Sequence, residues 1–557
     1  MSTLFVTLIL GTAVLLSWPL GKAMTWAMNP DGQIGGFRNG VEQLFEKTAG
    51  KAITREQTWK EYALSMLLFN SFMFIVVYAV LSLQQILPLN PDGKGALSPD
   101  LIFHTATSFV TNTDFQHYSG EVSLSYFSQI FGLMWLQFVS AGTGIAALTA
   151  LAMGLSGKTL LGNFYRDLMR ATFLVLLPLA VVVAVLLLLG GVPMTLQGSA
   201  TARTLEGALQ TIARGPVAVF VAIKQLGTNG GGWFGVNSAH PFENPSFMTN
   251  IIECVSIVLL PMACVWMFGR ITGHMRHAAI VFAVMGILLI GMVGFVNYFE
   301  SAPTRVFAGL PIQAAGNIEG KELRFGPSAG PTWAAMTTAT SNGSVDCLHD
   351  SLNPLSGLIP LIGMWMNVTF GGVGVGLINM FLYIIVGVFI CGMMVGRTPE
   401  YLNRKVETRE MKFALLALLV HPLFILGGTA LFAATPWGVA AVHNPGAHGF
   451  TEILYEFSSE AANNGSAFAG LGDNTVPWNV AGGIVMLLAR FIPIILPLAI
   501  VGSLAAKKPA PETTGTLRTD TFLFGMVMLG SVVFIGALLF LPVAVLGPIA
   551  EHLAAGL

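Results

Sequence analysis

The stretch LGTNGGGWFGVNSAHPFENP, residues Leu226–Pro245, contains one of four similar polar turns in this chain. The four turns are TNTDFQ at Thr111–Gln116, TNGGGW at Thr228–Trp233, SNGSVD at Ser341–Asp346 and NNGSAF at Asn463–Phe468. Aligned on one asparagine each, they place Asn112, Asn229, Asn342 and Asn464 at nearly equal intervals. Similar motifs at a regular interval indicate internal repetition. The turns therefore predict a chain built from four repeats.

Each turn directly follows a moderately apolar stretch that is too short to span a membrane. These stretches are Asp100–Val110, Leu205–Leu226, Pro331–Thr340 and Thr451–Ala462. Short apolar segments are typical of re-entrant or interfacial helices rather than of spans. Irregular backbone at membrane depth is tolerated only inside protein or beside a watery cavity. The turns are therefore expected to lie within the protein.

The composition indicates a polytopic membrane protein. Of the 557 residues, 54% are apolar and only 10% are charged, whereas soluble domains average about 25% charged residues. Together with a mean hydropathy of +0.71, this excludes disordered, fibrous, coiled-coil and ordinary soluble proteins. The net charge of −1 gives no reason to expect a nucleic-acid partner. Four cysteines without a CxxC pair do not suggest a disulfide framework or a zinc site.

Ten apolar runs are long enough to cross a bilayer of roughly 30 Å. They lie near 3–24, 62–88, 124–154, 166–190, 248–269, 277–298, 357–396, 413–434, 480–504 and 521–547. Runs of this length favour helices over a β-barrel, whose strands alternate about every second residue. The first run lacks a basic segment before it and a clear cleavage motif after it, so we expect a span rather than a signal peptide.

Basic residues concentrate in the loops that follow odd-numbered runs, especially 38–60, 397–412 and 507–518. The positive-inside rule places these loops in the cytoplasm. Both termini and the four turn-bearing loops are then expected to face outward.

Each expected repeat consists of a span, a short helix, a turn and a second span. Two spans return the chain to its starting side, so the repeats share one orientation and are related by an axis along the membrane normal. The expected fold is all-α, with four pseudo-symmetric repeats around a central selectivity filter. The expected units are 62–154, 155–269, 270–396 and 397–504, preceded by a span and loop at 1–61 and followed by a span at 505–557.

Four such turns are suited to a monovalent cation. Rings of backbone carbonyls replace the water shell of a dehydrated ion, and glycine and asparagine permit the unusual dihedral angles that this requires. The C-terminal end of each short helix is partly negative and favours a cation. Taken singly, Asn-Gly is an ordinary surface turn, and Asn342 and Asn464 also match glycosylation sequons. Four evenly spaced copies behind short apolar helices favour the pore.

Six segments resemble the KdpA family, the A subunits of potassium-transporting ATPases. They are Phe109–Glu121, Leu226–Pro245, His349–Gly357, Phe370–Leu377, Gly396–Lys412 and Asn463–Leu471. The resemblance runs from the first span to the last and implies four span–pore helix–span units with an added span at each end. It also implies K⁺ as the bound and transported ion. The implied filter residues are Asn112, Thr113, Asp114, Gln116, Thr228, Asn229, Gly230, Gly231, Gly232, Ser341, Asn342, Gly343, Asn463, Asn464 and Gly465.

The resemblance further implies a multi-pass protein of the bacterial inner membrane, surrounded by lipid, within an ATP-driven importer. A separate P-type subunit, KdpB, hydrolyses ATP there, KdpC and KdpF complete the complex, and ions pass sideways from the filter to KdpB. Three positions depart from the pattern expected of the family: Asn342 stands where some members have Cys, Trp233 where Phe is expected and Asp346 where Asn is expected. Asp346 is expected to add charge near the mouth.

Two further features are candidates for gating. The cluster FGGVGVG, with Phe370, Gly371, Gly372 and Gly374, interrupts the seventh apolar run and is expected to break the helix below the third turn. Close helix packing through small residues is the alternative. Arg490 lies inside the ninth run, where a charge is costly and indicates a functional position. The alternative is an arginine that extends to the membrane surface or pairs with a helix end.

No catalytic site is expected in this chain. Ala152–Thr159 (AMGLSGKT) matches a relaxed phosphate-loop pattern but closes a span, where the helix end repels phosphate. No DKTGT phosphorylation motif occurs, so we do not expect the chain to bind ATP. A membrane enzyme is therefore disfavoured. An autonomous potassium channel or an ion-coupled potassium symporter of the same superfamily remains the alternative function.

Overall fold

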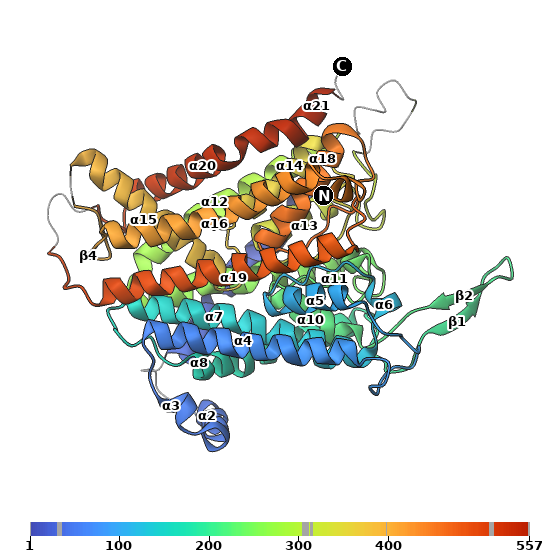
Figure 1. The fold of residues 1–557 in the computed structure, drawn as a ribbon, viewed down its shortest axis with the longest axis horizontal. Coiled ribbons are helices and arrows are strands. Elements are labelled where there is room, and N and C mark those ends of the chain that lie inside the picture. Colours follow the sequence, from blue (N-terminus) through green and yellow to red (C-terminus); the bar gives the residue numbers. More distant parts are fainter. Residues whose placement is uncertain are drawn as a thin grey trace.

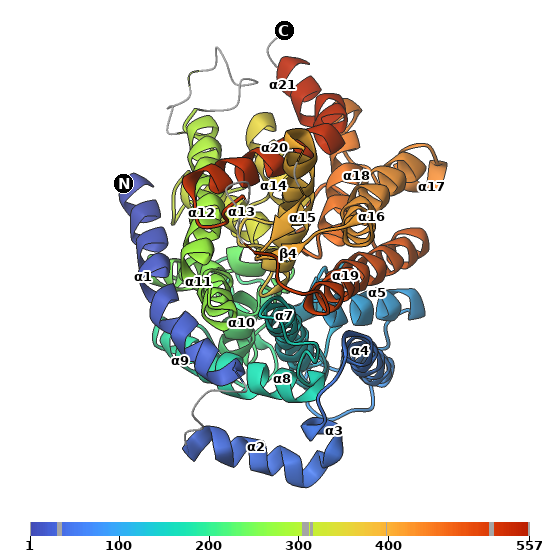
Figure 2. The ribbon, with the colours of Figure 1, turned by 90° about the vertical axis from the view of Figure 1, so that its left-hand side faces the viewer.

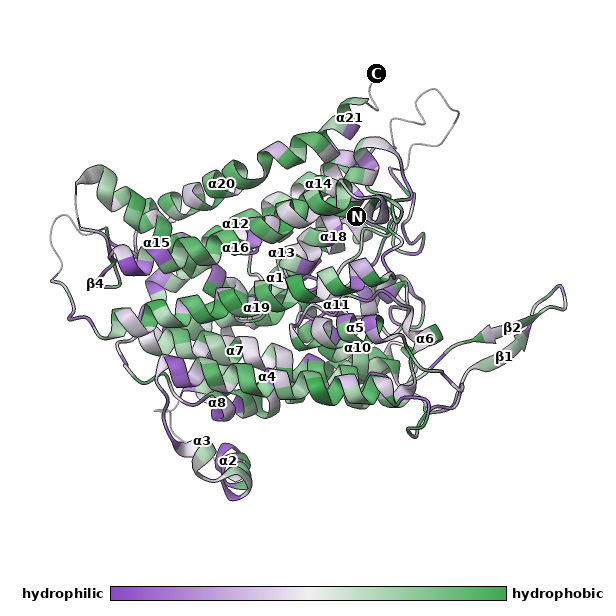
Figure 3. Ribbon diagram, in the orientation of Figure 1, coloured by the Kyte–Doolittle hydropathy of each residue, from purple (hydrophilic) through white to green (hydrophobic). Residues whose placement is uncertain are grey.

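In this computed structural model, residues 2–29, 36–302, 311, 316–396, 398–511 and 517–554 are described. Among them, ten helices are long and apolar enough to cross a membrane, as predicted (Figure 1). These spans are Thr3–Met28, Trp59–Ser82, Ser128–Leu155, Phe164–Leu189, Phe247–Thr272, Met275–Glu300, Val375–Met394, Thr408–Ala433, Val476–Ala505 and Phe522–Ala554. Apolar residues run along the helices and polar residues gather toward their ends (Figure 3). The chain is a multi-pass, mostly helical membrane protein.

The spans comprise the following elements. They are α1 (Ser2–Met28), α4 (Trp59–Ser82), η1 and α7 (Ser128–Met134 and Trp135–Leu155), α8, η2 and α9 (Phe164–Arg170, Ala171–Leu176 and Leu177–Leu189), α11 (Phe247–Thr272), α12 (Met275–Glu300), α15 (Val375–Val395), α16 (Thr408–Ala433), α19 (Val476–Ala505), and α20, η5 and α21 (Phe522–Ala544, Val545–Ile549 and Ala550–Ala554). Several begin at side-chain caps. Thr58 and Ser246 form capping boxes at α4 and α11, and such caps contribute about 1 kcal/mol each.

The helices follow one another around a central region. Viewed along the spans, the chain passes from α4 through α11, α12 and α16 to α19 (Figure 2). There α19 packs against α4, α5 (Pro99–Val110) and α7. Because α19 contacts α4, α5 and α7, the bundle forms a closed ring of helices.

Each of the four predicted short helices is present and ends directly before its turn. They are α5, α10 (Val217–Leu226), α13 (Ala329–Ala339) and α18 (Gly446–Ala461). The predicted stretch Leu205–Leu226 differs in its first half. Its start belongs to a β-hairpin of β1 (Ala200–Arg203) and β2 (Leu209–Ile212), which projects from one end of the molecule (Figure 1). Polar residues such as Thr201 and Gln210 are suited to this exposed hairpin.

The seventh apolar run is broken, as the glycine cluster predicts. It forms α14 (Pro354–Met366) and α15, with irregular backbone at 367–374 between them. Asn367, Phe370, Gly371 and Gly374 have φ values of 47°, 60°, 48° and 80°. A left-handed backbone cannot continue a right-handed helix, so only α15 is a full-length span.

Short elements cover the two ends. They are α2 (Gly36–Ala49), α3 (Lys51–Thr54), α6 (Gly120–Ser123), η3 (Asn237–Ala239), β3 (Glu400–Tyr401), β4 (Arg404–Lys405) and α17 (Pro436–Val439). The end with α2, α3 and β4 lies opposite the β1–β2 hairpin, and α21 ends toward the hairpin side (Figure 1). Arg397, one of the basic residues of 397–412, lies outside the described residues.

Close helix packing attaches α1 to α11. A Cβ atom on Gly21 would lie 2.5 Å from Trp266 Cβ and 2.9 Å from the Ala263 carbonyl oxygen, whereas nothing lies within 4 Å of such an atom on Gly11. We predict that Gly21→Val lowers the free energy of unfolding by about 1–3 kcal/mol through overpacking. Thermal unfolding of the detergent-solubilised chain measures this, with Gly11→Val as the control on the same helix. Equal midpoints for the two variants would contradict the α1–α11 contact.

Candidate functional site

The four turns contact one another through their backbones. A Cβ atom on Gly230 would overlap the carbonyl oxygen of Asn342, one on Gly343 that of Asn464, and one on Gly465 that of Thr113. The second and first turns also touch, because a Cβ atom on Gly231 would lie 2.9 Å from Asp114 Cβ. These contacts connect all four turns in one ring. The structure thus brings together segments that are far apart in the sequence.

The turns share one hydrogen-bond pattern at the ends of their short helices. The N–H groups of Thr113, Asn229, Asn342 and Asn464 each donate to the carbonyl oxygen five residues earlier, at 2.8–3.0 Å. Thr113, and not Asn112, therefore occupies the position of the three asparagines. The alignment on Asn112 is wrong by one residue, because backbone geometry rather than side-chain identity sets the register.

The backbone conformation repeats at two positions of every turn. The first position has φ of 63°, 47°, 48° and 51° at Asn112, Thr228, Ser341 and Asn463, and the second has 53°, 85°, 92° and 98° at Asp114, Gly230, Gly343 and Gly465. Left-handed residues other than glycine cost roughly 1–3 kcal/mol each and persist only where their surroundings hold them. Five such residues in one ring mark a strained backbone that its surroundings hold in place.

The asparagine side chains connect neighbouring turns. Asn342 Nδ2 donates to the carbonyl oxygen of Lys224 at 3.2 Å, and Asn464 Nδ2 donates to that of Thr337 at 3.0 Å. Both acceptors lie near the C-terminal end of the preceding repeat's short helix. Asn112 Nδ2 likewise donates to the Thr228 carbonyl oxygen at 2.8 Å. The carbonyl oxygens of Lys224 and Thr337 already accept the backbone N–H groups of Asn229 and Asn342, so the asparagine side chains add a link from one turn to the next.

The remaining predicted residues of the first two turns join the same ring. Gln116 Nε2 donates to the Gly232 carbonyl oxygen at 3.0 Å, and Gly232 N–H donates to Gln116 Oε1 at 2.8 Å. Asp114 Oδ2 accepts from Gln137 Nε2 at 2.8 Å. Of the three consecutive glycines, only Gly230 has a positive φ. Gly231 and Gly232 are needed for close packing instead.

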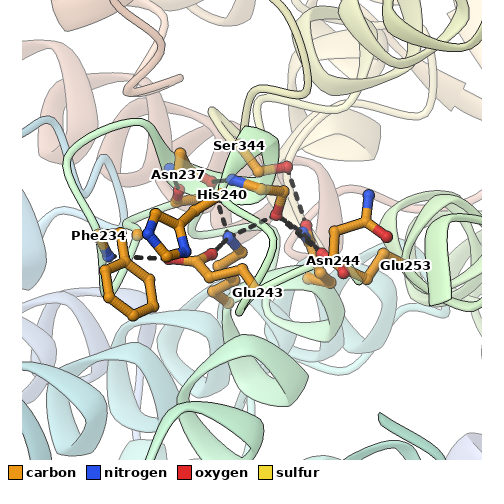
Figure 4. A network of polar contacts seen from close by, with 12 residues as sticks. Phe234, Asn237, His240, Glu243, Asn244, Glu253 and Ser344 are labelled. Carbon is orange, nitrogen blue, oxygen red and sulfur yellow. Dashed lines mark hydrogen bonds and ion pairs between the residues drawn. The ribbon is translucent and has the colours of Figure 1, made fainter. Parts of the chain in front are cut away.

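A buried polar network supports the second turn from behind (Figure 4). The Lys224 ammonium forms an ion pair with Glu243 and donates to Asn237 Oδ1 and Ser238 Oγ at 2.7 Å. Glu243 also accepts from the Phe234 N–H at 2.9 Å, and Asn237 Nδ2 donates to the Gly230 carbonyl oxygen at 2.6 Å. The sequence analysis missed Lys224 and Glu243. Their signal is an apolar helix that carries one lysine, with one glutamate in the loop that follows it.

Comparison with known proteins identifies the family. The model of the family "KdpA: Potassium-transporting ATPase A subunit" matches residues 7–553. The chain belongs to this family. It is 46% identical over 550 residues to the potassium-transporting ATPase potassium-binding subunit of Geobacillus kaustophilus, covering 98% of each chain. The crystal structure of the potassium transporter TrkH from Vibrio parahaemolyticus has a similar fold, with a TM-score of 0.53 at 12% identity, covering 87% of this chain and 95% of that one.

An irregular loop of this chain, 367–374, lies directly against the turns. Thr228 Oγ1 accepts from the Val373 N–H at 2.9 Å, and Gly371 N–H donates to the Ala339 carbonyl oxygen at 3.2 Å. Ser341 Oγ donates to Asn367 Oδ1 at 2.6 Å. The loop therefore contacts residues of the second and third turns.

A cavity adjoins this loop and contains Arg490. Its lining includes Ser341, Asn367, Gly372, Asn463 and Arg490. Arg490 is 5% exposed, and the described residues include no carboxylate that forms an ion pair with it. The structure thus places the two predicted gating features beside one cavity next to the third and fourth turns.

All three departures from the family pattern are buried, and Asn342 belongs to the third turn itself. Trp233 packs against the rings of Tyr126 and Phe220. Asp346 is 1% exposed, and its carboxylate accepts from Asn250 Nδ2 at 3.0 Å and from Asn244 Nδ2 at 3.4 Å. Asp346 is therefore a buried carboxylate held by amide donors rather than an exposed charge, and it lies in the wall of a cavity that Gln116, Gly343 and Gly465 also line.

A histidine links the C-terminal helix to the fourth short helix at the outer edge. His448 Nδ1 lies 2.8 Å from Glu551 Oε1, and His448 Nε2 lies 2.6 Å from Asp350 Oδ1. Although burial disfavours the charged form, hydrogen bonds and the negative charges of Asp350 and Glu551 raise the pKa of His448 to about 10. His448 is accordingly a protonated link between α18, α21 and the loop after the third turn.

The Lys224–Glu243 pair generates a prediction about stability. We expect Glu243→Gln to destabilise the fold by about 3–5 kcal/mol, because it leaves a buried ammonium without its counter-charge. The control is Glu322→Gln, which breaks a partly exposed pair with Arg324, where about 0–1 kcal/mol is expected. Thermal unfolding of the two variants measures the difference. A Glu243→Gln midpoint no lower than that of Glu322→Gln would contradict a supporting role for this pair.

Proposed function

We propose that this chain is the potassium-binding subunit of an ATP-driven potassium importer. In this proposal K⁺ enters from the outside and is selected at the ring of four turns. The observation that carries the proposal is the backbone contact of each glycine, Gly230, Gly343 and Gly465, with a carbonyl of the neighbouring turn. Such contacts place backbone oxygens from different repeats within one narrow ring. The proposed ion-binding residues are the filter residues predicted from the sequence.

Three physical features of the ring favour a dehydrated monovalent cation. Carbonyl oxygens replace the hydration shell of K⁺ without adding formal charge. The short helices α5, α10, α13 and α18 all end at the ring, so their partly negative ends add to a favourable potential. Asp114 is the carboxylate among the proposed filter residues, whereas a divalent ion generally requires several.

Below the ring, we propose that the ion turns sideways toward a partner. The cavity beside Arg490 extends to Leu382 and Tyr383 of α15, Ala417 and Leu418 of α16, and Leu539 and Phe540 of α20. An unpaired guanidinium next to this cavity repels cations that approach the opposite membrane surface. The loop with Phe370, Gly371, Gly372 and Gly374 is proposed to gate the exit from the filter.

The partner in this proposal hydrolyses ATP. The curated relative is named as a subunit of a potassium-transporting ATPase, and the family is not a catalytic one. We propose KdpB as the ATPase subunit, KdpC and KdpF as further partners, and the bacterial inner membrane as the location. In this arrangement both termini face outward. The four units 62–154, 155–269, 270–396 and 397–504 are proposed to be the pore repeats.

An autonomous channel or ion-coupled symporter is the second candidate, because the fold also resembles a potassium transporter, TrkH. Purification of the tagged chain from its native membrane distinguishes the two. The importer predicts co-purification of a P-type ATPase whose hydrolysis is stimulated by K⁺. Potassium flux through the chain alone in vesicles, with no co-purifying ATPase, would support the channel or symporter instead.

The ring generates a prediction about K⁺ affinity. We expect Gly343→Ala to weaken K⁺ binding by about 100-fold or more, since strain of roughly 2.8 kcal/mol is sufficient for that change. The added methyl group would overlap the Asn464 carbonyl oxygen at a left-handed backbone position. Calorimetric titration of the purified complex with KCl measures the affinity. Gly427→Ala is the control, because nothing lies within 4 Å of a Cβ atom there. Similar affinities for both variants would contradict the proposed filter.

Arg490 generates a prediction about leakage. We expect Arg490→Gln to raise ATP-independent K⁺ efflux from proteoliposomes by about tenfold, which corresponds to a barrier lower by roughly 1.4 kcal/mol. Arg490→Lys retains the positive charge, so its ATP-independent K⁺ efflux is expected to stay at the wild-type level. Efflux that is unchanged in Arg490→Gln, with transport still coupled to ATP hydrolysis, would show that the residue does not form the barrier.

A further inference from the structure

A second polar cluster lies between the first and fourth repeats, away from the contacts of the ring. It contains two histidines and three carboxylates, namely His104, His117, Glu456, Glu460 and Asp473. His104 belongs to α5 and both glutamates to α18, whereas His117 and Asp473 follow the first and fourth turns. The sequence analysis did not identify this cluster, because more than 300 residues separate the histidines from the carboxylates along the chain.

His117 is the centre of the cluster. Its Nε2 atom lies 3.0 Å from Glu456 Oε1 and 3.9 Å from Asp473 Oδ2. One ligand atom from each of these three residues lies within 4.8 Å of the others, and the same holds for His104, His117 and Glu460. Two possible ligand triads therefore share His117.

The other ring nitrogen of His117 is already fixed. His117 Nδ1 lies 2.7 Å from Asn479 Oδ1, and because an amide oxygen can only accept, Nδ1 is the donor. Asn479 Nδ2 in turn donates to Asp100 Oδ2 at 2.7 Å. Histidines that ligate a metal generally donate their second N–H to a carbonyl or carboxylate oxygen, which leaves the first nitrogen free for the ion. His117 is thus presented with Nε2 toward the carboxylates.

The interior of the cluster has unsatisfied polar atoms. Both ring nitrogens of His104 and both carboxylate oxygens of Glu460 are buried without a hydrogen-bond partner, and each residue is 0% exposed. His104 Nε2 and Glu460 Oε1 lie 3.9 Å apart, which is beyond hydrogen-bond distance. Buried carboxylates are normally paired with a cation or coordinate a metal. No lysine or arginine forms an ion pair with Glu456, Glu460 or Asp473 among the described residues.

We propose that this cluster binds one divalent transition-metal ion of the zinc class, with His117, Glu456 and Asp473 as ligands. His104 and Glu460 line the inner side of the site. Imidazole and carboxylate ligands in a set of three, with a position left for water, suit Zn²⁺. A K⁺ ion is disfavoured here because imidazole nitrogen prefers transition metals and zinc.

The side chain of Asp473 is 18% exposed, whereas those of His117 and Glu456 are at most 1% exposed. The ion therefore reaches the site from the Asp473 side. Once bound, it connects the segment after the first turn to the fourth short helix and to the segment after the fourth turn. The ion thereby holds the last repeat against the first, at a position outside the proposed K⁺-binding ring of turns.

The test uses the full chain purified in detergent within its complex, stripped with a chelator and then titrated with ZnCl₂ against a chromogenic chelator. We expect one equivalent of Zn²⁺ per chain, a higher thermal midpoint with Zn²⁺ present, and no displacement by excess KCl. His117→Gln is expected to weaken Zn²⁺ binding by about 100-fold or more, since even indirect contacts to a metal ligand contribute 10–100-fold. The isosteric Glu456→Gln variant is expected to weaken it in the same direction.

Two controls locate the ion. His448→Gln removes a histidine from the separate group of Asp350, His448 and Glu452, and His274→Gln removes an exposed one. Both are expected to retain the Zn²⁺ equivalent. The proposal is overturned if the wild-type complex binds no Zn²⁺, if His117→Gln and Glu456→Gln both bind it as tightly as wild type, or if His448→Gln loses it. The Zn²⁺ titration of the wild-type complex tests the proposal even where a variant does not fold.

Discussion

Backbone contact between the four turns is the constraint on which the rest of the structure depends. Gly230, Gly343 and Gly465 each lie where a single methyl group would overlap a carbonyl of the next turn. Segments that approach this closely require short helices that deliver each turn to the same depth. Those helices in turn require flanking spans on all four sides, and the structure has them. The pseudo-symmetric bundle follows from the need to hold this ring together.

Irregular backbone inside a membrane protein has a second requirement, which is that its backbone N–H and C=O groups find partners. The side chains of Asn342 and Asn464 donate to carbonyl oxygens near the ends of the neighbouring short helices and so link adjacent turns. The Lys224–Glu243 network supports the second turn, and the loop at 367–374 contacts the second and third turns. The turns are therefore held both by contacts within their own segment and by contacts with neighbouring turns. Strain stored at Asn112, Thr228, Ser341 and Asn463 is held by these contacts.

Much of this architecture could be predicted from the sequence because it depends on local composition. Apolar length predicts the ten spans and the short helices, and the glycine cluster predicts the break before α15. The register of the first turn could not be predicted, since Thr113 replaces an asparagine at a position that only the backbone defines. The β1–β2 hairpin could not be predicted because it depends on where the chain is exposed to solvent. The Lys224–Glu243 pair and the His117 cluster could not be predicted because they depend on tertiary contacts. Single-sequence patterns report none of these directly.

Ion density on the central axis tests the account most directly. Crystals or frozen grids of the complex prepared in RbCl or TlCl, compared with a matched sodium preparation, locate the heavier ion in the map. The account predicts density within coordination distance of the carbonyl oxygens of Thr113, Asn229, Asn342 and Asn464, and none there with sodium alone. Density that is absent from this ring, or confined to another part of the chain, would contradict it.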